Sequence, residues 1–196
     1  MTAGRKINSD SQDWCTPPKY VNAVRRFFGE IYLDPCSNTK SIVHAKTEYM
    51  LLEIDGLKAS WDFSTIYVNP PYGIDKIRRT SIIDWIRKCA HAYNAYKSEV
   101  LALIPVAVNT RHWKQYVFGQ ANSICFLADT RLKFINGTND KGAPMACAMV
   151  YWGKDEERFY EHFSQHGAVV NITNLKKADW ISPDLKTNQV KLFDEK

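Results

Sequence analysis

Four consecutive residues, Asn69, Pro70, Pro71 and Tyr72, combine fixed hydrogen-bond acceptors with an aromatic ring. They directly follow the apolar run 66–68, which we expect to be a buried strand. The two prolines fix two φ angles and remove two backbone donors. The amide oxygen of Asn69 and the carbonyl oxygen of Pro70 therefore form two closely held acceptors at a strand end. Asn-Pro is also a common turn dipeptide, but the position after an apolar strand favours a functional site over a plain rigid loop.

Two acceptors of this kind can bind both protons of one –NH2 group. An aromatic amine such as the exocyclic amine of adenine is a poor nucleophile, because its lone pair is delocalised into the ring. Hydrogen bonds to both protons draw the nitrogen toward sp³ geometry and stabilise the charge that develops in a transition state. Tyr72 offers a face for a planar base, a stacking contact worth about 1–3 kcal/mol. The segment therefore predicts chemistry on a planar amine and requires no general base within the motif.

The composition is that of one globular domain. The chain has 196 residues, of which 45% are apolar and 24% are charged, enough for a sizeable core. Its net charge of +5 suits a polyanionic partner, and suits an ordinary solvated basic surface equally well. The five scattered cysteines form no Cys-x-x-Cys pair, which argues against a disulfide framework or a zinc site and favours the reducing cytoplasm. The polar first residues predict no signal peptide, and no apolar run is long enough to predict a membrane partner.

Apolar strands alternate with amphipathic helices along the chain. We expect helices over 17–28, 37–46, 76–96, 109–118 and 155–167, and strands over 30–35, 65–68, 98–106, 121–128 and 168–172. Residues 131–135 and 145–152 predict a β-hairpin. Strands that are apolar throughout indicate an α/β fold, with a mostly parallel sheet, an antiparallel edge hairpin and helices on both faces.

The chain predicts one domain with two polar ends. We expect a flexible N-terminus over 1–13, a single domain over 14–172 and a C-terminal tail over 173–196. Within the domain, Asp34 and Asn69 each end a predicted strand. Ligands of such sheets bind at the carboxyl ends of the strands, so the two side chains should meet at one rim.

Five sequence segments extend the pattern beyond the Asn-Pro-Pro-Tyr motif. The segments DWCTPPKYVNAV, LDPCSN, DGLKASW, VNPPYG and RLKF with a following GAP occur in this order over residues 13–144, within a resemblance that covers roughly residues 13–153. This series resembles the small phage-type DNA N6-adenine methyltransferases, the Dam family of phage and prophage origin, which use S-adenosylmethionine (AdoMet). The resemblance implies a Rossmann-like class I methyltransferase fold, and the cytoplasm of a bacterial host as the compartment. The NPPY motif alone is shared with protein-glutamine methyltransferases and some RNA methyltransferases.

The resemblance also implies roles for matching positions. Asn69 to Tyr72 would be catalytic. The residues that would bind the cofactor are Trp14, Thr16, Pro17, Asp34, Pro35, Cys36, Asp55 and Leu57. Two features depart from the usual pattern: the first strand is followed by no glycine-rich turn, and both Glu48 and Glu53 are candidates for the acid that binds the cofactor ribose.

Basic side chains near the predicted rim are candidates for contacts with DNA. They are Lys76, Arg78, Arg79, Arg111, Arg131 and Lys133. Contacts with phosphates supply affinity without reading sequence, and solvated surface positions are the alternative for each. An adenine inside a duplex must be flipped out before it can react. The chain has no room for a separate recognition domain, which predicts a short recognition sequence or relaxed specificity.

Two other classes of function remain open from the sequence. One is an AdoMet-dependent methyltransferase that acts on RNA adenine or on a protein glutamine amide, since the same acceptors fit any planar –NH2 group. The other is a non-enzymatic DNA-binding relative that has lost cofactor binding, which the glycine-poor first loop favours. Binding of AdoMet discriminates the second class from an enzyme.

Overall fold

The computed structural model describes residues 14–51, 53–129, 131–136, 139–143, 145–178 and 180–181. Its helices are α1 (Pro18–Phe28), α2 (Ile82–Tyr96), the π-helix η1 (Trp113–Phe118), α3 (Glu156–Phe163) and the short 3₁₀ helices η2 (Ser164–His166) and η3 (Thr173–Lys177). Its strands are β1 (Leu33–Ser37), β2 (Thr47–Met50), β3 (Thr65–Val68), β4 (Glu99–Pro105), β5 (Ser123–Leu127), β6 (Lys133–Asn136), β7 (Asn139–Gly142), β8 (Cys147–Trp152) and β9 (Gly167–Asn171). The expected flexible segment 1–13 and residues 182–196 of the expected tail lie outside the described residues.

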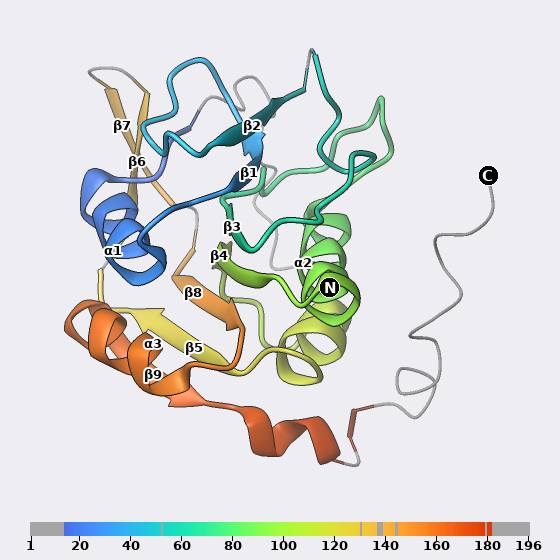
Figure 1. The fold of residues 1–196 in the computed structure, drawn as a ribbon, viewed down its shortest axis with the longest axis vertical. Helices are drawn as coiled ribbons and strands as arrows, with labels where there is room; N and C mark the ends of the chain where they lie inside the picture. Colours follow the sequence, from blue (N-terminus) through green and yellow to red (C-terminus); the bar gives the residue numbers. More distant parts are fainter. Residues whose placement is uncertain are drawn as a thin grey trace.

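Seven strands form the central sheet in the order β2-β1-β3-β4-β8-β5-β9 (Figure 1). Strands β2, β1, β3 and β4 are parallel to one another. Strand β8 is antiparallel to both β4 and β5, so β5 runs in the same direction as the first four strands. The edge strand β9 is antiparallel to β5. This mixed, mostly parallel sheet confirms the predicted α/β, Rossmann-like methyltransferase fold.

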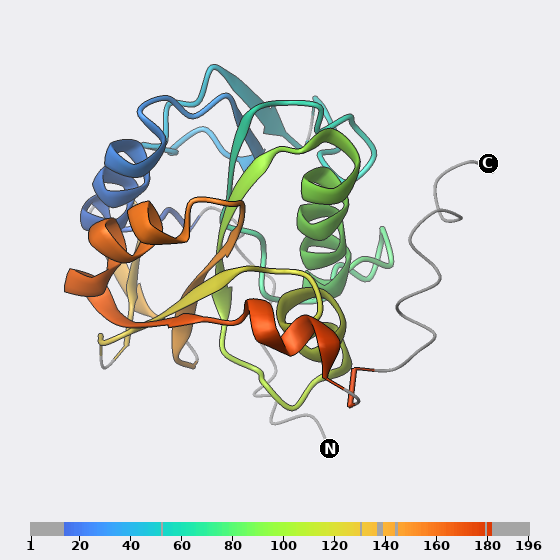
Figure 2. The same ribbon diagram turned by 60° about the horizontal axis from the view of Figure 1, so that its bottom comes forward.

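Helices cover both faces of the sheet, as predicted. Figure 2 shows α1 and α3 on one side and α2 on the other. Alternate residues of β3 serve the two faces: Tyr67 belongs to the core beneath α1 and α3, whereas Ile66 and Val68 belong to the core beneath α2. Burial of each large apolar side chain contributes about 1.5–3 kcal/mol, and the five residues 100–104 of β4 are wholly buried between the two layers.

Local signals determine where the main helices begin and end. Helix α1 has Pro18 at its first position, where a missing backbone donor costs nothing. It ends at Gly29, which has a positive φ of 72° and donates its backbone N–H to the Arg25 carbonyl at 2.8 Å. Helix α2 begins with a capping box in which the Ser81 N–H donates to the Asp84 carboxylate at 2.9 Å.

The expected helix over 76–96 therefore begins six residues late. The Asp75 carboxylate accepts hydrogen bonds from the backbone N–H groups of Ile77 and Arg78, which holds this stretch in a turn. The expected helix over 37–46 is wrong. There the Asn38 side chain accepts from the Lys40 N–H at 2.9 Å in another local turn, and no helical turn follows it.

The expected pairing of 131–135 with 145–152 is also wrong. Strand β6 pairs with β7 in a separate two-stranded sheet, which lies beside α1 in Figure 1. All six residues of β8 are buried, so this strand suits the middle of the main sheet, where β4 and β5 flank it. The antiparallel edge of the main sheet is instead formed by β9 against β5.

Candidate active site

Strands β1 and β3 are parallel neighbours, with Leu33 opposite Ile66. Asn69 directly follows β3, as the sequence predicts, but Asp34 does not end its strand: it is the second residue of β1, which continues through Pro35 to Ser37. Asp34 therefore lies about two residues before the level of Asn69, inside the sheet. The backbone of Asn69 lies against the thiol of Cys36, which connects the two strand ends directly.

The Asn69 amide is oriented by the N-terminal segment. Its Nδ2 donates a hydrogen bond to the Trp14 carbonyl oxygen at 3.3 Å. None of the described residues donates a hydrogen bond to Asn69 Oδ1 or to the Pro70 carbonyl oxygen. With the donor side of the amide held by the backbone, both predicted acceptors remain available for an incoming amine.

Tyr72 is fixed at both its hydroxyl and its ring. The hydroxyl donates to the Leu103 carbonyl of β4 at 3.3 Å and lies 3.7 Å from Cys147 Sγ. The ring packs edge-on against Phe134 of β6, with centroids 5.6 Å apart and an angle of 81° between the rings. Burial raises the pKa of the Tyr72 hydroxyl well above its usual value. The phenol is therefore a neutral anchor, and the partly exposed ring is held in one position.

The segment before α1 is built into the same rim. The Thr16 hydroxyl is 2.7 Å from the Tyr67 hydroxyl, and Thr16 is almost completely buried. Cys15 and Ile135 exchange two backbone hydrogen bonds, of 2.8 and 3.1 Å, which attach β6 to this segment. Pro17 immediately precedes the helix. The hydroxyl pair and the attachment of β6 were not predicted from the sequence, because both join residues more than 50 positions apart.

Asp34 is an acid in an apolar setting. It is 4% exposed, and burial raises its pKa to about 7, with the nearby Glu48 charge acting in the same direction. Its Oδ1 accepts from the Cys36 N–H at 3.1 Å, which opposes the shift only in part. No ion pair joins it to a described Lys, Arg or His side chain. A buried carboxyl without a cation is suited to a positively charged ligand group.

Glu48 and Glu53 differ in their places relative to this acid. Glu48 lies on β2 directly opposite Asp34 in the strand register. Glu53 follows the strand and is exposed. Glu48 is thus the acid that the sheet brings next to Asp34.

The Asp55–Leu57 segment packs against the end of β1. A Cβ placed on Gly56 would lie 1.8 Å from the Pro35 carbonyl oxygen, so only glycine allows this close approach. The Leu57 N–H donates to Asp55 Oδ1 at 3.0 Å. On the far side, Trp61 Nε1 donates to the Gly56 carbonyl at 2.8 Å.

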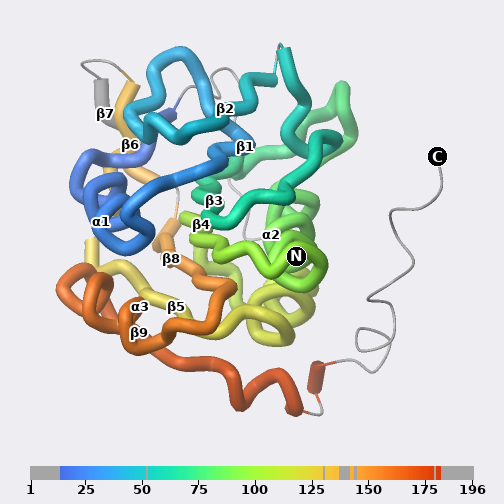
Figure 3. Tube along the Cα trace, viewed as in Figure 1, coloured from blue at the N-terminus to red at the C-terminus, as the bar shows by residue number. Residues whose placement is uncertain are grey.

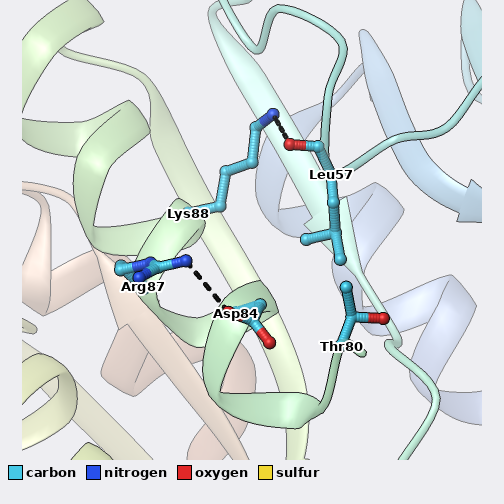
Figure 4. Close-up of a pocket in the computed structure, with 5 residues that line it drawn as sticks. All are labelled: Leu57, Thr80, Asp84, Arg87 and Lys88. Atoms are coloured by element: carbon cyan, nitrogen blue, oxygen red, sulfur yellow. Dashed lines mark hydrogen bonds and ion pairs between the residues drawn. The ribbon is translucent and has the colours of Figure 1, made fainter. Parts of the chain in front are cut away.

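Lys88 of α2 holds the Asp55–Leu57 segment through hydrogen bonds to its backbone and to the residues that follow it. Its Nζ donates to the Leu57 carbonyl at 2.6 Å and to the Ala59 carbonyl at 2.5 Å. Burial lowers the pKa of Lys88 to about 8. A cavity of about 100 Å³ adjoins these groups, with Lys88 and Arg87 facing Leu57 and Thr80 across it (Figure 4). Nothing in the sequence pattern singles out Lys88, because it is one more polar position on an amphipathic helix.

The predicted DNA contacts fall into two groups. Arg78 is 17% exposed and makes ion pairs with Asp75 at 2.8 Å and with Asp55 at 3.1 Å. It therefore links the loop after the Asn-Pro-Pro-Tyr motif to the Asp55 segment, a connection that sequence reasoning missed. The other predicted cations are exposed on the surface: Lys76, Arg79, Arg111, Arg131 and Lys133.

The described residues contain neither a membrane-spanning helix nor a candidate metal site. None of the helices there combines the length and apolar character needed to cross a membrane. Likewise, the described part of the chain contains no group of three His, Cys, Asp or Glu side chains placed to hold a metal ion.

Comparison with known proteins identifies a family for this chain. A search of curated proteins and a search of solved structures found no match to the chain. A family model described as DNA N-6-adenine-methyltransferase (Dam) matches residues 4–178. The match spans the N-terminal segment, both strand ends, the Asn-Pro-Pro-Tyr motif and the β6–β7 sheet. The chain therefore belongs to the Dam family of DNA N-6-adenine-methyltransferases.

Proposed function

We propose that the protein transfers a methyl group from AdoMet to the exocyclic amine of adenine in DNA, with a short or relaxed recognition sequence. The observation that carries this proposal is the hydrogen bonding of the Asn69 side chain. Its Nδ2 is held by the Trp14 carbonyl, while its Oδ1 and the Pro70 carbonyl accept nothing from the described residues. Family membership supplies DNA adenine as the substrate.

In the proposed mechanism, Asn69 Oδ1 and the Pro70 oxygen each accept one proton of the adenine amine. This localises the nitrogen lone pair and stabilises the positive charge that develops as the amine attacks. Pro71 keeps the turn rigid, and the base stacks on the Tyr72 ring. The amine loses its extra proton after transfer, so no described side chain needs to act as a base.

The residues around the rim fit AdoMet. When bound, AdoMet supplies an electrophilic methyl group on a sulfonium. The Asp34 carboxyl, buried without a cation, would pair with the ammonium of the methionine moiety, and Pro35 and Cys36 would line the same turn. Trp14, Thr16 and Pro17 would face the carboxylate end. Gly56 lets the Asp55–Leu57 segment pack directly against Pro35 of this turn.

The adenine end of the cofactor would lie at Asp55 and Leu57. Asp55 Oδ1 already accepts hydrogen bonds from the Leu57 N–H and from Arg78. A carboxylate has further acceptor positions, so Asp55 can accept from the cofactor's adenine amine while it keeps Arg78. Leu57 offers an apolar surface to the ring.

The exposed cations support DNA as the partner. Lys76 and Arg79 follow the catalytic motif, Arg111 precedes η1, and Arg131 and Lys133 accompany β6. We propose that they contact phosphates, and that Arg78 acts from the inside by fixing the loop. The five free cysteines support the cytoplasm of a bacterial host as the site of the reaction.

In the test, the purified protein is incubated with labelled AdoMet and with DNA, RNA or a glutamine-containing protein. Each substrate that takes up the label is then digested to identify the methylated group. We expect label in N6-methyladenine of DNA. Asn69→Ala should abolish transfer without loss of AdoMet binding in calorimetry. Asn94→Ala, on α2, serves as the matched control, because the Asn94 side chain bonds only Gln120 among the described residues. Label in RNA or protein alone, or full activity of Asn69→Ala, would refute the proposal.

A further inference from the structure

The loop that follows the catalytic motif is closed at its base. We name residues 75–80 the Ile77 loop. The Asp75 N–H donates to the Thr80 carbonyl at 2.9 Å, and the Thr80 N–H donates back to the Asp75 carbonyl at 3.1 Å. Asp75 Oδ1 also accepts from the N–H groups of Ile77, at 3.0 Å, and Arg78, at 2.9 Å. Residues 76–79 are therefore a short tip with a fixed backbone.

Arg78 anchors this tip to the body of the protein. Its guanidinium joins Asp75 at 2.8 Å and Asp55 at 3.1 Å, with all three side chains less than one fifth exposed. Figure 3 shows the segment between β3 and α2 running beside the one that carries Asp55. The single guanidinium holds both nearby carboxylates and offsets part of their negative charge.

The outer side of the tip is an unusual combination of side chains. Ile77 is 96% exposed, and Ile74 at the entrance to the loop is 68% exposed. Lys76 and Arg79 beside Ile77 are exposed, and their side chains make no ion pair or hydrogen bond with other described residues. Arg79 has a φ of 55°, a left-handed backbone that a non-glycine residue adopts at some cost. The fold thus holds an apolar side chain in water between two unpaired cations.

Single exposed apolar residues are common on protein surfaces. Here the apolar residue stands on a braced tip five positions after Tyr72, and both neighbours carry the charge that phosphates attract. We propose that Ile77 is the wedge that enters the DNA duplex beside the target adenine and fills the space that the base leaves when it is flipped out. Lys76 and Arg79 bind the flanking phosphates, and Arg78 keeps the wedge in register with the catalytic motif.

This inference rests on the proposed function and adds the residue that performs the flipping. Aliphatic wedges in other DNA-binding proteins separate adjacent base pairs without forming hydrogen bonds. Such a residue lowers the cost of extrusion for any sequence, which suits a short or relaxed recognition site. An adenine that is already unpaired has little to gain from a wedge.

The experiment first maps the methylated adenines of the wild-type protein by sequencing, and then uses an oligonucleotide duplex that contains one mapped site. We expect Ile77→Ala and Ile77→Ser to lower kcat/KM on this duplex at least about tenfold. Ile77→Leu, which keeps an aliphatic side chain, should stay within about twofold. Val170→Ala, which truncates an exposed residue on the distant edge strand β9, should also stay within about twofold.

Rescue separates a wedge from a merely structural residue. On the same strand made single-stranded, or paired with an abasic position opposite the target, Ile77→Ala should return to within about threefold of wild type. With 2-aminopurine at the target position, wild type should raise the fluorescence on binding and Ile77→Ala should not. AdoMet calorimetry on each variant shows whether it is folded.

Equal activity of Ile77→Ala and wild type on the duplex would overturn the wedge and leave the proposed function intact. A loss of the same size on unpaired and paired substrates would also overturn it, because the residue would then act on something other than extrusion. A wild-type protein that methylates no DNA would refute the proposed function and the wedge with it.

Discussion

Replacement of Asp34 by asparagine should remove a pH dependence that this buried carboxyl imposes on folding. The asparagine is isosteric, and its Oδ1 can still accept from the Cys36 N–H, so the hydrogen bond at 3.1 Å survives. What disappears is the ionisable proton. Asp34 has a pKa of about 7 in the folded protein, against 3.8 for an ordinary aspartic acid.

The sign follows from which state ionises first. Below about pH 4 the carboxyl is protonated in both the folded and the unfolded chain and contributes no difference. As the pH rises through 4 to 7, the unfolded chain ionises while the folded chain retains its proton, so the free energy of unfolding falls. Above pH 7 both states are ionised, and the accumulated loss is about 4 kcal/mol, since each pKa unit corresponds to about 1.4 kcal/mol. Between about pH 5 and about pH 8 the loss is about 2.5 kcal/mol.

The assay is urea unfolding of wild type and Asp34→Asn at several pH values without cofactor. Other carboxyls titrate in both proteins, so the difference between the two isolates Asp34. The variant should gain stability relative to wild type by about 2.5 kcal/mol from about pH 5 to about pH 8. A difference that does not change with pH would refute this account of the buried carboxyl.

The same proton should control cofactor binding. If the AdoMet ammonium pairs with ionised Asp34, affinity measured by calorimetry should fall about tenfold for each pH unit below about 7. In Asp34→Asn, binding should be weak and nearly independent of pH in this range. Wild-type affinity that stays constant from pH 5 to pH 8 would contradict the proposed role of Asp34.

Three further substitutions, and one control, test the support of the site. Gly56→Ala places a Cβ 1.8 Å from the Pro35 carbonyl and should lower the free energy of unfolding by about 3 kcal/mol, whereas Gly73→Ala meets nothing within 4 Å and should change it by less than about 0.5 kcal/mol. Equal urea midpoints for the two would count against the close approach. Lys88→Met leaves the Leu57 and Ala59 carbonyls without their donor, so the free energy of unfolding should fall by about 2 kcal/mol and the affinity for AdoMet should also fall. Unchanged AdoMet affinity in calorimetry would show that the Asp55–Leu57 segment keeps its position without Lys88. The lysine of Arg78→Lys cannot pair with two carboxylates in the same geometry, so the variant should lose about 1 kcal/mol of stability in thermal unfolding and should methylate duplex DNA more slowly. Wild-type stability and a wild-type rate of methylation would show that Arg78 does not anchor the loop.

The sequence predicted the end of β3 correctly because its signals are local. An apolar run followed by two prolines predicts a strand that stops at Asn69. The two-sided burial of the strands likewise predicted helices on both faces. These inferences require only periodicity and turn chemistry. The expected strand end at Asp34 was wrong, because β1 continues through Pro35 to Ser37.

The remaining features depend on partners that sequence patterns do not identify. The direction of the Arg78 side chain is decided by Asp55, which lies 23 positions earlier in the chain. The orientation of the Asn69 amide is decided by a backbone carbonyl 55 positions away. Strand β8 was assigned to the wrong partner because a fully buried strand shows no alternation that would reveal its neighbours.

Single-molecule sequencing of DNA from methylation-deficient cells that express the wild-type chain or Asn69→Ala tests the central claim most directly. The account predicts N6-methyladenine at a short recurrent motif in the wild-type sample, and only background in the Asn69→Ala sample. Unmodified adenine in the wild-type sample, or the same methylation in both samples, would contradict it.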